Sequence, residues 1–186
     1  MADPARKRAT YEDLLAAPAH LVAQLLEGTL YTLPRPAAPH ARAASTLGID
    51  LGGPFDRQRG GPGGWHILYE PELHLAADIL VPDLAGWRRE RLPSIPRAAF
   101  FTLAPDCVCE VLSPSTAGID RGVKLSIYAR ESVPHVWFVD PDARTLEVLA
   151  LDGSSYRVHA VHHDRERVRA NPFEAIELEL AALWVD

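Results

Sequence analysis

Lysine is almost absent from this chain. Of its 19 basic residues, two are lysines, Lys7 and Lys124, and the other 17 are arginines. Arginine carries a planar guanidinium that is always charged, whereas lysine carries a compact ammonium whose pKa changes on burial. A lysine at position 124 of such an arginine-rich chain therefore suggests a place that requires an ammonium.

Cysteine and long apolar runs are scarce as well. Cys107 and Cys109, the two cysteines of the chain, lie two residues apart and exclude a secreted disulfide framework. On a buried strand they are expected to act as small apolar residues, with metal or redox chemistry as the alternative. No apolar run approaches the about 18 residues that span a bilayer, and the N-terminus lacks the apolar core of a signal peptide. The sequence therefore predicts a cytoplasmic protein without a membrane partner.

The overall charge is negative. With 186 residues, 47% of them hydrophobic, the chain is expected to form one domain over 1–186, with 1–9 as a flexible tail. Its net charge of −6 at pH 7 argues against coating of nucleic acid by charge alone. A local basic surface remains open, and a solvated charged loop is the alternative. The candidates for such a surface are Arg35, Arg42, Arg57, Arg59, Arg88, Arg89 and Arg91.

Helices and strands are predicted to alternate along the chain. A capped helix is expected to begin at Thr10 and to end before Pro18. Strand-like segments are 65–70, 77–87, 107–112, 135–140, 145–151 and 155–161, with a hairpin over 22–34. Further helices are expected over 39–51, from the SPST turn to about 131, and over 179–184. These elements describe one mixed α/β domain.

A glutamate interrupts the most apolar of these strands, CVCEVL. Strand alternation places Val108, Glu110 and Leu112 on one face, so the glutamate points the same way as apolar neighbours. A buried carboxylate requires a partner, because leaving it ionised and alone costs several kcal/mol. The partner is either an arginine in a structural ion pair or a cation that a second carboxylate shares.

Two acids that follow a proline are candidates for that second carboxylate. Asp106 lies on the same extended segment as Glu110, about 13 Å away at about 3.3 Å per residue. Two carboxylates on one ion must approach within about 4–5 Å, so Asp106 is too far away unless the strand begins after it. Asp83 ends a different strand, which can pair beside the strand of Glu110. The geometry therefore favours Asp83.

Lys124 is expected two helical turns beyond Thr116. Its stem can pack among apolar neighbours while its ammonium reaches toward the strand of Glu110. Beside two carboxylates the ammonium stays charged, and it can hold a water or stabilise negative charge on a phosphate. The alternative is a surface lysine that pairs with Asp120, a helix-surface acid, at i,i+4 spacing.

These motifs also carry a family resemblance. VPDLAGW, APDCVCEVLSPST and DRGVKLSIYARESVPHVWFVDP resemble the putative restriction endonuclease (Uma-type) family of the PD-(D/E)xK nuclease-like superfamily. The resemblance extends from LLEGTLY nearly to the C-terminus. It implies an α+β restriction-endonuclease-like core, in which a mixed central sheet of about four or five strands is flanked by helices, with extra β-hairpins.

The resemblance implies roles for particular residues. Asp83 and Glu110 would be the catalytic and metal-binding acids, Lys124 the catalytic lysine, and Glu27 an additional metal ligand. The chain departs from the superfamily's plain motif at Leu112, where that motif has its lysine, and the family instead moves the lysine to the next helix. The candidates for substrate contact are His40, Arg42, Arg88, Arg121 and Tyr128.

The activity that follows from the resemblance is hydrolysis of phosphodiester bonds. It implies a DNA endonuclease that uses Mg²⁺ or Mn²⁺, since an all-oxygen ligand set suits hard cations. A homodimer is expected, because two sites can cut two strands. Two alternatives stay open: a catalytically weak nuclease-fold protein that binds nucleic acid or regulates, and a purely structural ion-pair role for the same acids. The absence of a separate DNA-reading motif favours the first of these.

Overall fold

A computed structural model describes residues 8–185 of the chain. The expected tail over 1–9 therefore lies mostly outside the described residues. Of its last two positions, Ala9 donates a backbone hydrogen bond of 2.9 Å to the carbonyl of Gly28. Within the described part, no helix has the length and apolar character needed to cross a membrane.

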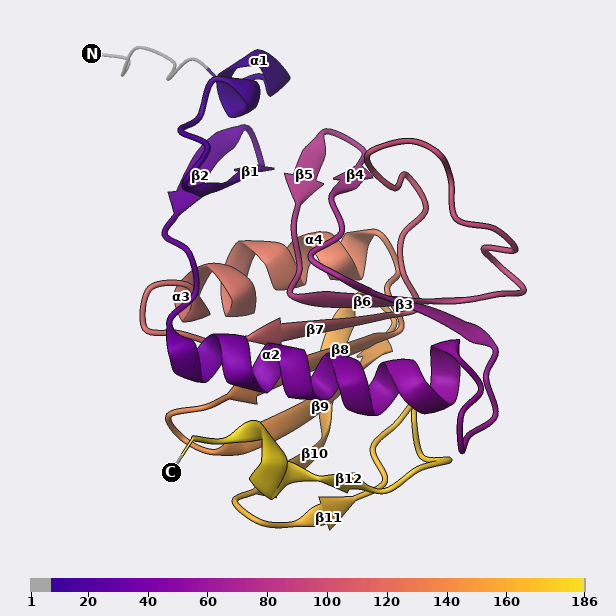
Figure 1. Cartoon of the computed structure of the whole chain (residues 1–186). Coiled ribbons are helices and arrows are strands. Elements are labelled where there is room, and N and C mark those ends of the chain that lie inside the picture. Colours follow the sequence, from indigo (N-terminus) through magenta and orange to yellow (C-terminus); the bar gives the residue numbers. More distant parts are fainter. Residues whose placement is uncertain (1–7, 186) are drawn as a thin grey trace.

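The central sheet has six strands and mixed directions (Figure 1). Its order is β10-β9-β8-β7-β6-β3, and β7 and β8 are parallel while the other neighbours are antiparallel. The strands are β3 (Trp65–Tyr69), β6 (Leu84–Arg88), β7 (Cys107–Val111), β8 (His135–Asp140), β9 (Thr145–Asp152) and β10 (Ser155–His163). The sheet has one strand more than the upper number expected. The mixed α+β architecture is confirmed.

A second, four-stranded sheet carries the predicted hairpin. Its order is β2-β1-β5-β4, with β1 (Val22–Leu26), β2 (Thr29–Leu33), β4 (Leu73–Leu75) and β5 (Asp78–Leu80). The single strand expected over 77–87 is wrong, because β5 and β6 belong to different sheets. Pro82 has no N–H for a strand ladder, so the chain leaves one sheet there and enters the other. Asp83 lies at this joint.

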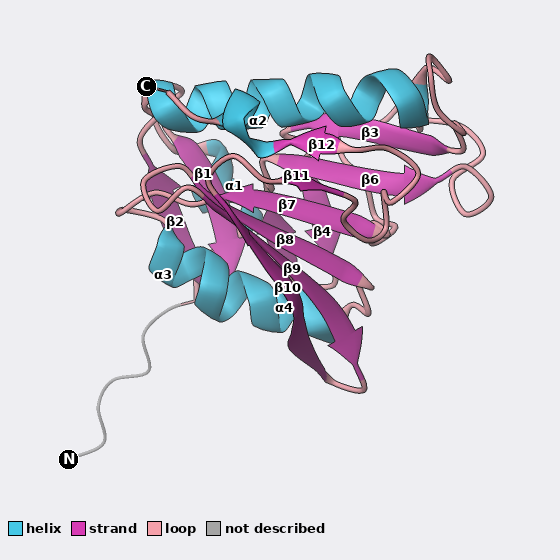
Figure 2. Ribbon diagram, turned by 90° about the horizontal axis from the view of Figure 1, so that it is seen from below, coloured by secondary structure: helices cyan, strands magenta, loops and turns pink. Residues whose placement is uncertain are grey.

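Helices cover both faces of the central sheet (Figure 2). The helix α1 (Tyr11–Leu15) begins with the predicted cap, since Thr10 and Asp13 form a reciprocal capping box. The helix α2 (Ala38–Leu51) covers one face, and α3 (Ala117–Ile119) and α4 (Leu125–Arg130) cover the other. A π-helical turn, Asp120–Lys124, joins α3 to α4. This helical segment supplies the crossover that parallel strands β7 and β8 require.

The two faces of β7 pack in the alternation that the sequence predicts. Cys107, Cys109 and Val111 join the core cluster that includes the buried face of α2. Val108 and Leu112 join the second cluster, which includes Ile127 and Tyr128 of α4. Both cysteines are buried, and neither forms a disulfide. Glu110 therefore faces the helical segment that carries Lys124.

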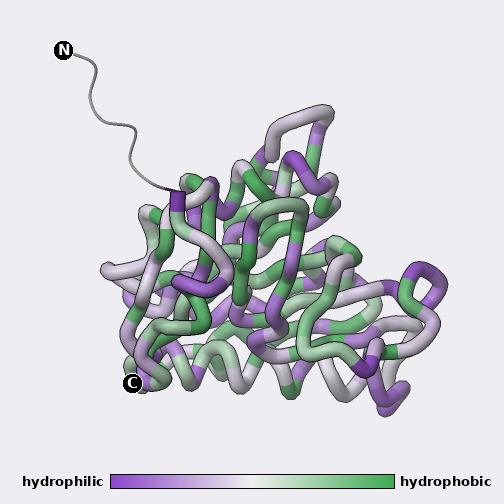
Figure 3. Tube along the Cα trace, turned by 90° about the horizontal axis from the view of Figure 1, so that it is seen from above, coloured by the Kyte–Doolittle hydropathy of each residue, from purple (hydrophilic) through white to green (hydrophobic). Residues whose placement is uncertain are grey.

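The remaining elements close the C-terminal end. A 3₁₀ turn, Leu180–Leu183, replaces the helix expected over 179–184, and β11 (Arg167–Val168) pairs with β12 (Leu178–Glu179) beside it. Hydrophilic stretches of the chain gather in loops at the edges of the molecule, and some also lie in its interior (Figure 3). Few polar side chains of the described residues are buried, and most of them meet at one place.

Candidate active site

Asp83 directly precedes β6, and Glu110 lies on the neighbouring strand β7. β6 and β7 are antiparallel, and Leu84 pairs with Cys109 in their register. One step further along the register, Asp83 falls opposite Glu110. Residues that face each other in this way have Cα atoms about 4.5–5.5 Å apart. The structure thus brings together two acids that stand 27 positions apart in the sequence.

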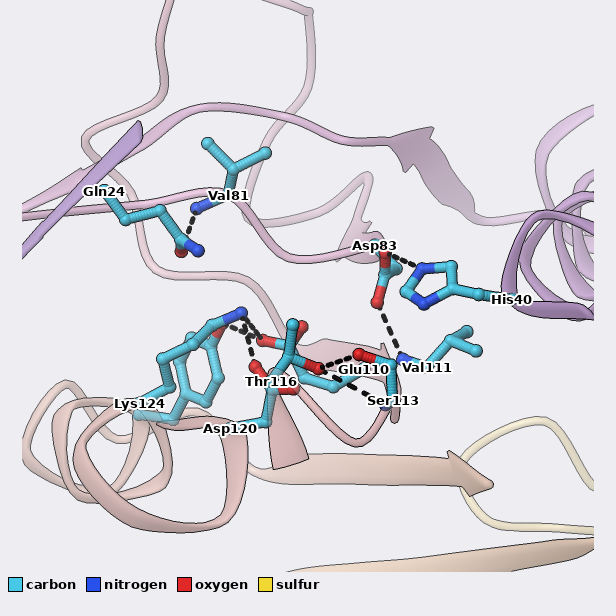
Figure 4. A network of polar contacts seen from close by, with 11 residues as sticks. Gln24, His40, Val81, Asp83, Glu110, Val111, Ser113, Thr116, Asp120 and Lys124 are labelled. Carbon is cyan, nitrogen blue, oxygen red and sulfur yellow. Dashed lines mark hydrogen bonds and ion pairs between the residues drawn. The ribbon is translucent and has the colours of Figure 1, made fainter. Parts of the chain in front are cut away.

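Asp83 is fixed through both of its carboxylate oxygens (Figure 4). One oxygen, Oδ1, lies 2.7 Å from Nε2 of His40, in the first turn of α2. The other, Oδ2, accepts a 2.7 Å hydrogen bond from the backbone N–H of Val111. His40 is buried, and its ring orients the carboxylate toward the end of β7.

Lys124 is enclosed by two acids. Its ammonium lies 2.6 Å from Oε1 of Glu110 and 3.1 Å from Oδ1 of Asp120. The hydroxyl of Tyr128 donates a 2.6 Å hydrogen bond to the same oxygen of Glu110. Lys124 is only 2% exposed, Glu110 1% and Asp120 3%. The i,i+4 pair with Asp120 is present, but the expectations of a surface lysine and a surface acid are wrong.

Burial and neighbouring charges shift the pKa values of Glu110, Lys124 and Tyr128. Burial raises the pKa of Glu110 to about 8, although the neighbouring ammonium of Lys124 acts to lower it. Burial alone would lower the pKa of Lys124, but Glu110 and Asp120 outweigh it and hold that pKa above its ordinary value. Burial and the adjacent Glu110 likewise raise the pKa of Tyr128. The ammonium therefore stays charged, and Glu110 retains an affinity for a proton or for a further cation.

The group opens onto a cavity of about 280 Å³. One part of its lining comes from the segment before β6, from β7 and from the helical segment beyond β7. Another part comes from β1, β2 and the segment that leads into α2. Arg35 and Lys124 are its two residues with a permanent positive charge. The polar lining residues are Gln24, Arg35, His40, Glu70, Asp83, Glu110, Ser113, Ser115, Thr116, Asp120 and Lys124.

Glu27 lies elsewhere. It occupies the turn of the β1–β2 hairpin at φ 50°, and its backbone N–H donates to Oδ1 of Asp78 at 2.5 Å. It lines a different cavity, together with Asp78 and Arg130. The structure therefore does not bring Glu27 to Asp83 and Glu110, because a residue at the tip of a hairpin projects away from the strands on which the acids lie.

The expected arginines are also engaged outside the cavity. Nε of Arg42 donates to the carbonyl of Ala182 at 3.2 Å. Arg88 lies over the ring of Trp65, 4.6 Å from its centroid. Arg121 forms an ion pair with the carboxylate of Glu147. None of the three arginines lines the cavity, whereas His40 does and the hydroxyl of Tyr128 reaches Glu110.

Asp106 has a structural role instead of a place in the cavity. Its Oδ2 accepts a 2.8 Å hydrogen bond from the backbone N–H of Arg88, and its Oδ1 lies 2.8 Å from the guanidinium of Arg91. β7 begins at Cys107, directly after Asp106, and Asp106 does not line the cavity that Glu110 lines. The pairing of Asp106 also uses part of the arginine cluster for packing of the fold.

Gln24 is a cavity residue that the motifs did not indicate. Its side chain is 2% exposed, and its Oε1 accepts a 2.9 Å hydrogen bond from the backbone N–H of Val81. Val81 precedes Pro82 and Asp83, so this bond supports the joint at which Asp83 lies. The signal in the sequence was the same as for Glu110: a polar residue within an apolar strand.

The donor set fits a hard cation by its chemistry. Asp83 and Glu110 offer carboxylate oxygens from adjacent strands, with Asp120 behind Lys124, and such oxygens are the ligands that Mg²⁺ and Mn²⁺ prefer. Among residues 8–185, no three His, Cys, Asp or Glu side chains are already gathered closely enough to hold an ion. A divalent ion between Asp83 and Glu110 would bind the carboxylates that now contact His40 and Lys124.

Comparison with known proteins places the chain in a family. The model of the family described as "Uma2: Putative restriction endonuclease" matches residues 8–182. A crystal structure described as a putative nuclease belonging to DUF820 from Anabaena variabilis ATCC 29413 superposes with a TM-score of 0.75 at 20% identity, over 94% of this chain and 96% of that one. It shows that the fold is shared. No curated protein matches the chain. The protein belongs to the Uma2 family of putative restriction endonucleases.

Proposed function

We propose that this protein is an endonuclease that hydrolyses phosphodiester bonds of DNA with the help of Mg²⁺ or Mn²⁺. The observation that carries the proposal is the buried ammonium of Lys124, 2.6 Å from Glu110, in a cavity that Asp83 also lines. Burial of an ammonium costs free energy because the group loses its hydration, and Glu110 and Asp120 must replace it. We take this cost as a sign that the charge has a role in the site.

Each residue of the site has a proposed task. Asp83 and Glu110 would hold the divalent ion, which supplies Lewis-acid stabilisation of phosphate charge and lowers the pKa of a water. Lys124, kept charged by Asp120, would donate to a phosphate oxygen or orient the attacking water. His40 would position Asp83, and the hydroxyl of Tyr128 would position Glu110.

The second candidate is a catalytically weak protein of the same fold that binds nucleic acid or regulates. Two observations favour it: the net charge of −6 and the ion pair that Lys124 already makes with Glu110. Activity in the presence of metal separates the two candidates. The expected homodimer and cytoplasmic location remain predictions, and the oligomeric state follows from light scattering of the purified chain.

The experiment is a cleavage assay with supercoiled plasmid, single-stranded DNA and RNA, in Mg²⁺, Mn²⁺ or EDTA. Asp83→Asn and Glu110→Gln are expected to lower metal-dependent cleavage of DNA by about 100-fold or more. Asp106→Asn is a matched control, since Asp106 also follows a proline but lies outside the cavity. The proposal fails if the wild type cleaves no DNA in either metal, or if the two site variants cleave as fast as the wild type.

A further inference from the structure

The cavity has a side that the proposed chemistry does not use. This side is formed by the β1–β2 hairpin and the segment that follows it, and its polar residues are Gln24 and Arg35. The opposite side presents three acids, Asp83, Glu110 and Asp120, around the single ammonium of Lys124, so on balance its charges repel a phosphate. An anionic substrate therefore needs hydrogen-bond donors from the hairpin side.

Gln24 offers one such donor inside the cavity. Its carbonyl oxygen is used by the N–H of Val81, at 2.9 Å, so the side chain has a fixed orientation. Gln24 as a whole is 2% exposed, and it lines the cavity. Its amide nitrogen has no hydrogen-bond partner within residues 8–185, and it is not among the fully buried polar atoms without a partner. The amide nitrogen is therefore accessible from the cavity. In Figure 4 the amide points into the space across from Lys124.

Arg35 offers a second donor at the rim. It is exposed, lies between Pro34 and Pro36, and lines the cavity. The two prolines restrict the backbone, which holds the arginine close to the opening. Within the described part of the chain its side chain makes no ion pair or hydrogen bond, in contrast to Arg42 and Arg121, which are engaged elsewhere.

We propose that Gln24 and Arg35 bind phosphate oxygens of the nucleic-acid backbone, Gln24 within the cavity and Arg35 at its rim. This inference rests on the proposed function for the class of substrate. It assigns the substrate contact to Gln24, which no motif indicated, and to Arg35, one of the arginines considered for a local basic surface. It also gives a negatively charged protein a local means of holding a polyanion. A guanidinium is suited to the task because it donates to a phosphate in a bidentate way.

The test is binding of a fluorescein-labelled DNA duplex to the full chain in EDTA, measured by fluorescence anisotropy over a range of salt concentrations. Arg35→Ala is expected to weaken binding about tenfold and to reduce the slope of log K against log salt by about 0.9. Arg35→Lys should recover part of the affinity and most of the slope. Arg165→Ala removes the same charge from an exposed arginine that does not line the cavity, and it should differ little from the wild type.

Gln24→Glu tests the second contact without loss of the bond to Val81, because a carboxylate oxygen also accepts from that N–H. Replacing the donor by an anion is expected to weaken DNA binding by tenfold or more. If Gln24→Glu instead strengthens Mn²⁺ binding and leaves DNA affinity unchanged, the assignment of Gln24 is overturned. If Arg35→Ala matches Arg165→Ala in affinity and slope, the assignment of Arg35 is overturned.

Cleavage of the same duplex in Mn²⁺ separates this inference from the proposed function. Arg35→Ala should raise KM with kcat changed less than twofold. Binding that depends on Arg35 without cleavage in any metal would reject the endonuclease and retain the phosphate contacts. Cleavage that is indifferent to Arg35 and Gln24 would reject the contacts and retain the endonuclease. A wild type that binds no nucleic acid would reject both.

Discussion

Two buried carboxylates pair with basic residues of the same helical segment, and the two pairs differ in what surrounds them. Asp78 lies 2.7 Å from the guanidinium of Arg130, whose side chain is 46% exposed. Glu110 lies 2.6 Å from the ammonium of Lys124, whose side chain is 2% exposed. In the first pair the guanidinium of Arg130 stays in contact with water. In the second pair both Glu110 and Lys124 are buried away from water.

The difference explains why the chain changes from arginine to lysine between these positions. An arginine with a solvated head costs little to fix and stabilises the turn at Glu27 through Asp78. A fully enclosed cation must instead fit a small space between acids, which a compact ammonium does and a planar guanidinium does not. We therefore interpret the rare lysine as part of the proposed catalytic site, and the arginine pair as a contribution to the stability of the fold.

The largest expected effect comes from removing the two cations. Lys124→Met should lower metal-dependent cleavage by about 100-fold or more, because it removes the charge that faces the phosphate. Arg130→Met should leave kcat within about threefold, since Arg130 does not line the cavity. Initial rates of plasmid cleavage in Mn²⁺ measure both. Equal losses in the two variants would mean that Lys124 acts only through the fold.

The next largest effect is expected on stability, when lysine and arginine are exchanged at positions 124 and 130. Lys124→Arg forces a larger planar group into a buried space and is expected to lower the free energy of unfolding by about 1–3 kcal/mol. Arg130→Lys should cost less than about 1 kcal/mol, because its partner-facing head is partly solvated. Urea unfolding of the two variants gives both values. Equal costs would break the comparison between the enclosed and the solvated pair.

Several features of the site were predictable from the sequence because they depend on short-range geometry. Strand alternation identified the face of Glu110, and the rise of a strand separated Asp106 from Asp83. The helical spacing placed Lys124 near that strand. These arguments use only distances within one element, which is why the structure agrees with them.

Other features depend on where elements meet, and the sequence did not predict them. Asp120 begins the π-helical turn Asp120–Lys124 and is buried beside Lys124, although it was expected on the helix surface. Glu27 and Gln24 belong to one hairpin, and only its packing decides which of them faces the cavity. The partners of Arg42 and Arg121 likewise come from distant segments.

A pH dependence sharpens the comparison further. Burial raises the pKa of Glu110 from 4.5 to about 8, so between these values the folded protein holds a proton that the unfolded chain has lost. The free energy of unfolding should therefore fall as pH rises through this window, by at most about 1.4 kcal/mol per pH unit, the value for one proton. Urea unfolding between about pH 5 and pH 8 measures it.

Two variants serve as controls for this slope. Glu110→Gln should remove most of it, and Asp78→Asn should leave it in place. Mn²⁺ should also bind more tightly as pH rises toward about 8, because the ion competes with the proton on Glu110. A slope that persists in Glu110→Gln would assign the proton to another group.

The smallest effect is expected at Glu27. Glu27→Gln should change Mn²⁺ affinity and cleavage by less than about twofold, since its side chain lines a cavity apart from Asp83 and Glu110. Isothermal titration with Mn²⁺ at constant pH gives the affinity. A tenfold loss would show that the hairpin turn moves toward the acids when metal binds.

Anomalous diffraction from crystals soaked in Mn²⁺ tests the central proposal most directly. The account predicts a manganese peak coordinated by the carboxylates of Asp83 and Glu110, with the ammonium of Lys124 close beside it. The account is contradicted if fully soaked crystals show no manganese peak at this position and Lys124 still contacts Glu110 and Asp120.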